Sequence, residues 1–138
     1  MNAKLVFEHA HCVVAQLNDH TISVKLNGFL KAEHLLDISR FIETFIKKHS
    51  ITAMMVNQTE LKVLSKDVLE QMTKIVHATA QNGIQKIAIV DAEDIFAKAS
   101  LGKLQKEAPF DVSVTHAHFL HERGALEWLH IAESNSVA

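Results

Sequence analysis

The hydrophobic pattern changes period along this chain, and that change constrains the fold more than any other feature. Apolar and polar residues alternate over residues 21–26, which is the period of a strand with one buried face. Over residues 31–49 the apolar side chains recur at helical spacing instead. Short, nearly continuous apolar runs follow at residues 51–56 and 87–90, and such runs are typical of strands covered on both faces. Strands and helices that alternate in this way predict parallel strands joined by helical crossovers.

The remaining segments of the first two thirds fit the same scheme. Residues 5–7 form a short apolar piece, and the β-rich run at residues 11–17 leads through residues 18–20 (Asn-Asp-His) into the alternating strand. Because Asn and Asp favour turns, this arrangement predicts an antiparallel hairpin. Ser65 is placed to cap a helix that Gly83 ends.

The last third predicts one more strand between two helices. Asp91 is expected to begin a helix that buries Phe96, and Pro109 separates it from a strand at residues 112–115. A final helix is expected over residues 122–132, with Trp128 also in the core. The predicted fold class is therefore α/β, a mixed β-sheet with an N-terminal antiparallel hairpin and parallel βα units, with helices packed on the sheet.

Length and composition indicate one domain over residues 1–138. The single Pro and four Gly leave no candidate linker between domains. The only cysteine, Cys12, lies in a predicted strand, so we expect a buried, inert thiol and no internal disulfide. No apolar run approaches the ~20 residues that span a bilayer, and a charge interrupts the N-terminus before any signal-peptide core, so we expect a cytoplasmic protein that is not transmembrane.

Charge and aromatic content argue against a nucleic-acid partner. Residues 1–69 carry 8 basic and 7 acidic side chains, and residues 70–138 carry 6 and 9, so neither half is basic enough to form an evident phosphate-binding surface. One Trp, no Tyr and seven Phe provide little for base stacking.

Three segments carry a resemblance to a known family. They are residues 24–30 (VKLNGFL), residues 87–90 (IAIV) followed by 94–97 (DIFA), and residues 125–129 (ALEWL). Together with the order of elements, they make nearly the whole chain resemble the STAS-like, SpoIIAA-like (STAS/SEC14-type) family of small bacterial domains. The resemblance implies a regulatory module that binds a small molecule, a lipid or a protein partner.

Antagonist members of that family carry a phosphorylatable serine in an Asp-Ser-Ser-Gly type motif. The corresponding stretch here, residues 57–67, begins with Asn57 and contains Ser65, but no Ser-Ser-Gly follows. Asn57 and Ser65 are candidate ligand-binding residues from this stretch. A phosphoswitch that uses Ser65 is one interpretation, because phosphoryl groups sit well at helix N-termini; helix capping is the other.

An acidic group follows the strand at residues 87–90. Asp91, Glu93 and Asp94 lie where ligands gather in open α/β sheets, at the carboxyl end of a parallel strand. Asp91 and Asp94 are therefore further candidates for binding Mg²⁺ or a hydroxylated ligand. The alternative is that these acids cap the following helix and complement its dipole.

Ten histidines form the most unusual feature of the composition. His9 and His11 make an H-x-H pair, and His116, His118 and His121 make H-x-H-x-x-H. Alternate strand positions face the same side, so either pair has metal-ligand spacing. Both groups also fall at predicted strand ends, where exposed histidines are ordinary, and we assign neither a metal nor a cofactor.

Two classes of function remain open. The leading interpretation is a non-enzymatic binding module, in which Met54, Met55 and Met72 line an adaptable apolar pocket and the uncovered first strand offers an edge for a homodimer. The alternative is a small metal-dependent or acid–base enzyme that uses Asp91, Asp94 and the clustered histidines. That alternative requires these groups, and the two histidine clusters, to converge in space.

Overall fold

The computed structural model describes residues 3–131, and within them the chain forms six strands and four helices. In chain order these are β1 (Lys4–His9), β2 (Cys12–Asn18), β3 (Thr21–Gly28), α1 (Ala32–His49), β4 (Ala53–Leu61), α2 (Lys66–Gln81), β5 (Lys86–Val90), α3 (Ile95–Glu107), β6 (Thr115–Phe119) and α4 (Glu122–Trp128). The predicted order of strands and helices is confirmed. The last residue of the predicted final helix, Ala132, lies outside the described residues.

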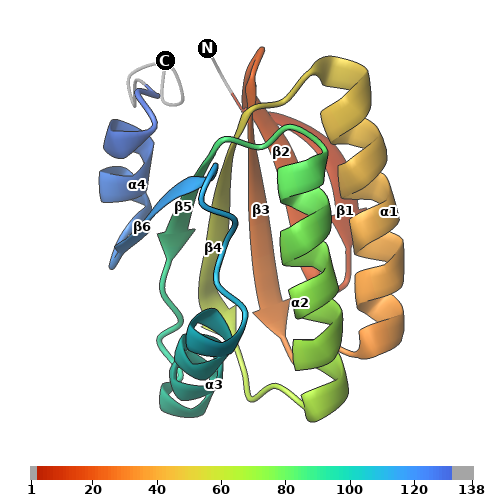
Figure 1. Ribbon diagram of the computed structural model, residues 1–138, viewed down its shortest axis with the longest axis vertical. Helices are drawn as coiled ribbons and strands as arrows, with labels where there is room; N and C mark the ends of the chain where they lie inside the picture. Colours follow the sequence, from red (N-terminus) through yellow and green to blue (C-terminus); the bar gives the residue numbers. More distant parts are fainter. Residues whose placement is uncertain (1–2, 132–138) are drawn as a thin grey trace.

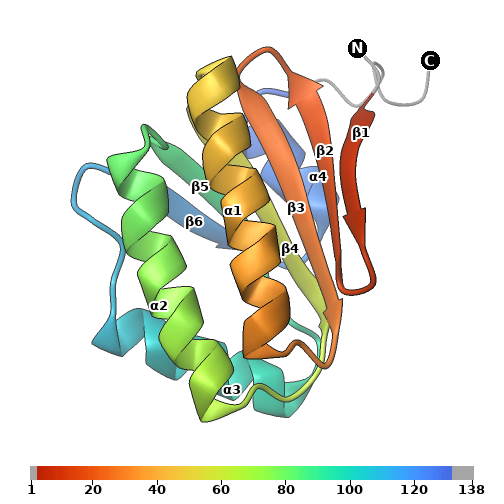
Figure 2. The ribbon, with the colours of Figure 1, turned by 90° about the vertical axis from the view of Figure 1, so that its right-hand side faces the viewer.

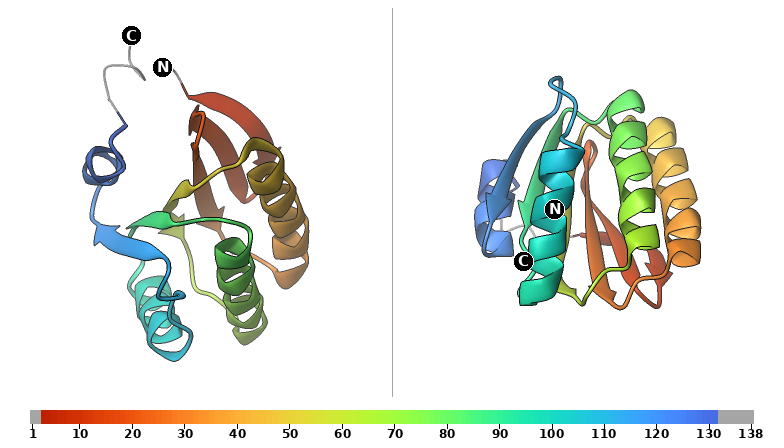
Figure 3. Two further views of the ribbon diagram at one scale, coloured as in Figure 1. Left: turned by 45° about the horizontal axis from the view of Figure 1, so that its top comes forward. Right: turned by 60° about the horizontal axis from the view of Figure 1, so that its bottom comes forward.

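All six strands form one sheet in the order β1-β2-β3-β4-β5-β6. The first three strands pair antiparallel, and β3 to β6 pair parallel, which confirms the predicted mixed sheet. Helices α1, α2 and α3 cover one face, and α4 covers the other (Figures 1 and 3). Figure 2 shows α1 and α2 side by side over the central strands, with β1 at the free edge of the sheet.

The core has two layers because the sheet is covered on both faces. Ile22, Val24 and Leu26 alternate along β3 and are buried in the larger cluster, with the apolar faces of α1 and α2. On the opposite face, Met55 and Val90 pack with residues of α4. Strand β5 contributes to both layers, which explains its continuous apolar run.

Local chemistry fixes several boundaries as predicted. The Ser65 side chain accepts a hydrogen bond of 3.2 Å from the backbone N–H of Val68 and so caps α2. Gly83 follows α2 with φ of 107°, a conformation that favours glycine. The turn between β2 and β3 is closed by Asn18, whose side chain accepts from the backbone N–H of His20.

The last strand lies further along the chain than predicted. Residues 112–115 read as apolar and β-branched, but the Asp111 carboxylate accepts from the N–H of Ser113, and the Asp111 carbonyl accepts from the N–H of Val114. These two bonds fold the segment into a turn and leave Val112 fully exposed. The strand therefore begins at Thr115, which is the residue that pairs with Lys86 of β5.

Helix α3 also starts later than predicted and is less buried. Asp94, and not Asp91, is its N-cap, because the Asp94 carboxylate accepts from the N–H groups of Phe96 and Ala97, both at 3.0 Å. The Phe96 side chain is 68% exposed, so its assignment to the core was wrong; Ala97 is the buried residue of this turn. Trp128 is half-buried against Phe119. No helix within residues 3–131 is long and apolar enough to cross a membrane.

Candidate functional site

A pocket of about 420 Å³ lies between the sheet and its three-helix layer. Its walls are mainly apolar and come from β3, β4 and β5 below and from α1, α2 and α3 above. Met54 and Met72 line it, as predicted for an adaptable apolar pocket. Met55 does not, because it points to the opposite face and packs in the α4 layer.

Six polar side chains also line this pocket. Thr79 is buried, and its hydroxyl donates to the carbonyl of Val76; the other five are exposed or half-buried. We call these five the polar rim: Gln58, Asp91, Lys98, Gln105 and His118. They come from the carboxyl ends of β4 and β5, from β6 and from α3. The pocket thus combines an apolar interior with a small set of polar groups at one side, which is the usual composition of a small-molecule site.

Asp91 and His118 form a hydrogen-bonded pair within the polar rim. Nδ1 of His118 lies 2.7 Å from Oδ1 of Asp91, and the two side chains are 38% and 25% exposed. Because a carboxylate oxygen accepts, Nδ1 of His118 carries the proton in this arrangement. The backbone N–H of Asp91 donates to the carbonyl of Phe119, so the residue is fixed to β6 by both its main chain and its side chain.

The pocket-facing side of α3 is unlike that of the other two helices. Lys98, Leu101, Gly102 and Gln105 recur at helical spacing and all line the pocket. A methyl group added at Gly102 would meet no atom within 4 Å. By contrast, α1 presents buried Leu and Ile side chains to the sheet. Helix α3 therefore covers the sheet without filling the space beneath it.

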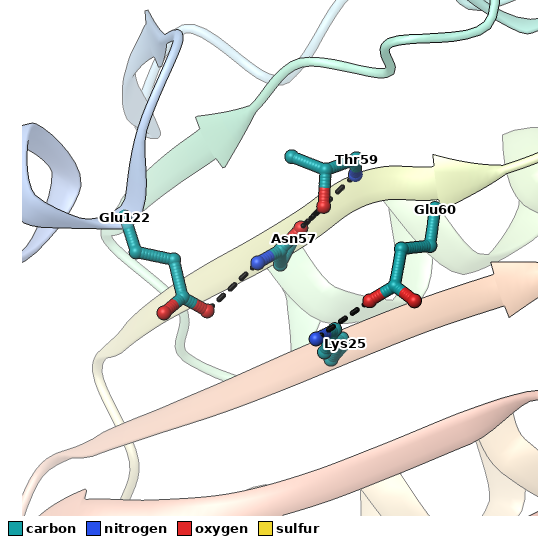
Figure 4. A network of polar contacts seen from close by, with 5 residues as sticks. All are labelled: Lys25, Asn57, Thr59, Glu60 and Glu122. Atoms are coloured by element: carbon teal, nitrogen blue, oxygen red, sulfur yellow. Dashed lines mark hydrogen bonds and ion pairs between the residues drawn. The ribbon is translucent and has the colours of Figure 1, made fainter.

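Asn57, a predicted site residue, lies on the other face of the sheet (Figure 4). It is 4% exposed; its amide donates to Glu122 at 2.7 Å, and its carbonyl oxygen accepts from the N–H and hydroxyl of Thr59. Beside it, Lys25 and Glu60 form an ion pair of 2.6 Å. Their hydrogen bond raises the pKa of Lys25 and lowers that of Glu60.

The four predicted site residues do not form one site. Ser65 and Asp94 each cap a helix, Asn57 binds α4, and Asp91 alone lines the pocket. Sequence reasoning missed the rest of the polar rim and Gly102. A signal was present, because Lys98, Gly102 and Gln105 occupy positions of α3 where an ordinary covering helix has apolar residues.

The two histidine clusters lie on opposite edges of the sheet. His116 and His118 project from β6, whereas His9 and His11 flank the β1–β2 turn. The ring centroids of His9 and His11 lie 5.0 and 4.9 Å from that of His34, a neighbour that the sequence did not reveal. Within residues 3–131, no group of three or more His, Cys, Asp or Glu side chains is placed to hold a metal ion. Of the convergence that the enzyme alternative requires, the structure therefore shows the contact between Asp91 and His118, whereas the two histidine clusters lie apart.

Large apolar side chains are exposed after each of the four parallel strands. Phe29 follows β3, Val63 follows β4, Ile95 and Phe96 follow β5, and Leu120 follows β6. Since the carboxyl ends of parallel strands meet at one edge of a sheet, these five residues share that edge. We call them the strand-end surface.

Comparisons with known proteins identify the fold. No protein-family model matches the chain, and no curated protein matches it in sequence. Among solved structures, the unphosphorylated anti-sigma factor antagonist SpoIIAA is similar with a TM-score of 0.60 and 13% identity, over 88% of this chain and 98% of that one. A DUF3478-family protein from Shewanella loihica PV-4, described as having a SpoIIAA-like fold, gives a TM-score of 0.62 and 18% identity, over 90% and 98%. The chain therefore has the SpoIIAA-like fold of the STAS type.

Proposed function

We propose that this protein is a non-enzymatic, STAS-like binding module that holds a small, largely apolar molecule in the pocket between the sheet and α1, α2 and α3. The observation that carries the proposal is the pocket itself. Its volume of about 420 Å³ falls within the range of small-molecule sites, and its polar side chains are few and, apart from Thr79, belong to the polar rim.

The size of the pocket indicates the size of the ligand. An apolar cavity of roughly 150 Å³ holds one benzene molecule. By that measure this pocket has room for a molecule of roughly 15 to 20 non-hydrogen atoms. Protein interiors are otherwise closely packed, and unfilled apolar space costs stability in proportion to its volume. A ligand that fills the pocket recovers those contacts.

Gly102 gives the proposal a second support. Glycine in a helix interior costs about 1 kcal/mol relative to alanine. Among residues 3–131, no atom lies within 4 Å of a Cβ added at Gly102, and the backbone there is helical, so neither packing nor backbone conformation requires glycine. Because Gly102 lines the pocket, the missing side chain supports a role in leaving room there for a bound molecule.

The test is binding of an environment-sensitive apolar fluorophore to the purified protein, compared with two Gly102 variants. Gly102→Phe places a ring in the pocket and is expected to weaken binding at least tenfold. Gly102→Ala adds one methyl group and is the matched control, expected to bind within about threefold of wild type. Urea unfolding of both variants shows that they are folded. Equal binding by wild type and Gly102→Phe would remove the pocket as the binding site.

A second copy of the chain is the second candidate partner, and the strand-end surface favours it. Exposed apolar side chains gathered at one edge of a sheet are typical of interaction sites, and SpoIIAA, which shares the fold, is named as an antagonist of another protein. If this surface forms a dimer, light scattering should show a dimer for the wild type and a monomer for the double variant Ile95→Ser, Phe96→Ser. A wild-type monomer at the highest soluble concentration, or a dimer that survives both substitutions, would exclude this surface as the dimer interface.

A further inference from the structure

The polar end of any ligand in the pocket must lie at the polar rim. The walls beyond it are formed by apolar side chains such as Val24, Ile38 and Ile87, and by Thr79, whose hydroxyl already donates to the carbonyl of Val76. Burying a polar group among them without a partner is costly. The polar rim therefore determines which polar head group a ligand can have, and the pocket volume limits the length of the apolar chain attached to that head group.

Asp91 is the charged acceptor of the rim. Its Oδ1 is occupied by His118, and no side chain or backbone group within residues 3–131 donates to its Oδ2. An ionised carboxylate accepts at both oxygens and donates at neither. His118 holds the carboxylate in one orientation, and its other oxygen remains available to a donor.

The charge around the rim disfavours an anion. Asp91, Glu93 and Asp94 follow β5 within four residues, and the lysine that lines the pocket there is Lys98. Lys98 is exposed, so solvent screens it, whereas Asp91 is only 25% exposed. A carboxylate head placed against Asp91 would meet a like charge at short range and would leave that oxygen without a donor.

We infer that the ligand carries a non-anionic head that donates a hydrogen bond to Asp91, a hydroxyl or an amine, on a single apolar chain. The inference rests on the proposed function, because it assigns the head group of a ligand for the same pocket. In this arrangement Asp91 binds the head, and His118 is a positioning residue that orients Asp91. Gln58 and Gln105 add neutral amides at the same rim.

Four ligands with twelve-carbon backbones separate the possibilities: dodecanol, dodecylamine, dodecanoate and dodecyl methyl ether. The carboxyl carbon of dodecanoate is one of its twelve, so its alkyl chain is one methylene shorter, a difference of roughly fourfold in affinity. Each competes with the apolar fluorophore for wild-type protein below its micellar concentration. The alcohol and the amine are expected to bind at least tenfold more tightly than the carboxylate and the ether. The ether keeps the chain and the acceptor oxygen and has a methyl group in place of the donated hydrogen. The ratio of the ether and alcohol dissociation constants therefore reports on hydrogen-bond donation.

Two matched variants test whether Asp91 is responsible. Asp91→Asn keeps the shape of the side chain and removes its charge. In this variant the affinities for the alcohol and the ether are expected to differ by no more than about threefold, and the affinity for dodecanoate is expected to rise relative to that for the amine. Glu93→Gln removes the same charge from a residue that does not line the pocket, and it is expected to leave the order of the four ligands unchanged.

The outcomes distinguish this inference from the proposed function. If dodecanoate binds as tightly as dodecanol, or if Asp91→Asn leaves every ratio unchanged, the head-group assignment is overturned while the pocket stands. If neither the fluorophore nor any of the four ligands binds, the proposed function fails and the inference fails with it. If the amine alone is tight, and Glu93→Gln weakens it as much as Asp91→Asn, general charge attraction replaces the hydrogen bond to Asp91.

Discussion

The Asn57 amide donates a 2.7 Å hydrogen bond to Glu122, a residue 65 positions later in the chain. This bond joins the buried middle of β4 to the first residue of α4 (Figure 4). Asn57 also accepts twice from Thr59, so its side chain is satisfied on both ends. The residue thus fixes α4 on the sheet, and its role in the fold is sufficient to explain its burial.

Replacement of Asn57 should therefore cost stability. Asn57→Ala removes the hydrogen bond from a buried amide to the Glu122 carboxylate and the two bonds from the half-buried Thr59, and we expect a loss of about 1–3 kcal/mol in the free energy of unfolding. Glu122→Gln is the control, because its amide oxygen still accepts from Asn57. Urea unfolding measures both variants. A loss under about 0.5 kcal/mol for Asn57→Ala would show that water replaces the network at little cost.

Two glycines that both face open space should respond in opposite directions to alanine. Gly102 is helical, so Gly102→Ala is expected to raise the free energy of unfolding by up to about 1 kcal/mol. Gly83 has φ of 107°, and Gly83→Ala is expected to lower it by about 1 kcal/mol or more, because an L side chain is strained there. Thermal or urea unfolding of the pair tests this. Destabilisation by Gly102→Ala would mean that the helix needs glycine there for a structural reason.

The Cys12 thiol should not react with alkylating reagents in the folded protein. Its side chain is fully buried, and this burial raises its pKa from 9.0 to about 12. Only the thiolate reacts, so iodoacetamide at pH 8 should leave the native protein unmodified and alkylate it fully in urea, as mass spectrometry would show. Rapid native alkylation would contradict the buried position.

The raised pKa of Cys12 also predicts how the free energy of unfolding changes at high pH. Above pH 9 the unfolded chain loses the Cys12 proton and the folded chain keeps it, so the proton is bound more tightly by the native state. Stability is therefore expected to fall as the pH rises from 9 towards 12, by about 1.4 kcal/mol per pH unit from this group. Cys12→Ala is expected to lack this component of the slope, and an unchanged slope in the variant would assign it to other groups.

The features that could be predicted from the sequence are those determined by residues close together in the chain. The period of β3, the Ser65 cap and the Gly83 turn depend on residues within a few positions, and all three are as predicted. Asp91 and Asp94 are equally good N-caps by chemistry. Asp94 directly precedes α3 and caps it, whereas the Asp91 carboxylate is bonded to His118, 27 residues away, a contact that no local pattern contains.

The pocket depended on the same kind of long-range information. Phe96 has helical spacing, but α3 covers the sheet from a distance that leaves the pocket beneath it, so that turn buries only Ala97. His34 joins His9 and His11 only because α1 begins beside the β1–β2 turn. Helical periodicity identifies an amphipathic face, and it does not show how completely that face is filled.

Ser65 offers a direct separation of capping from phosphoswitching. Ser65→Ala removes the acceptor for the N–H of Val68 and is expected to cost about 1 kcal/mol of unfolding free energy, whereas Ser65→Asp keeps an acceptor there and should cost less than half of that. The hydroxyl is on an exposed residue, so it is accessible to a kinase. If the protein is a phosphoswitch at this residue, phosphate incorporation from a lysate of its host should appear in wild type and vanish in Ser65→Ala. Incorporation that survives Ser65→Ala would leave Ser65 with the cap alone, because the stability loss is then its whole effect.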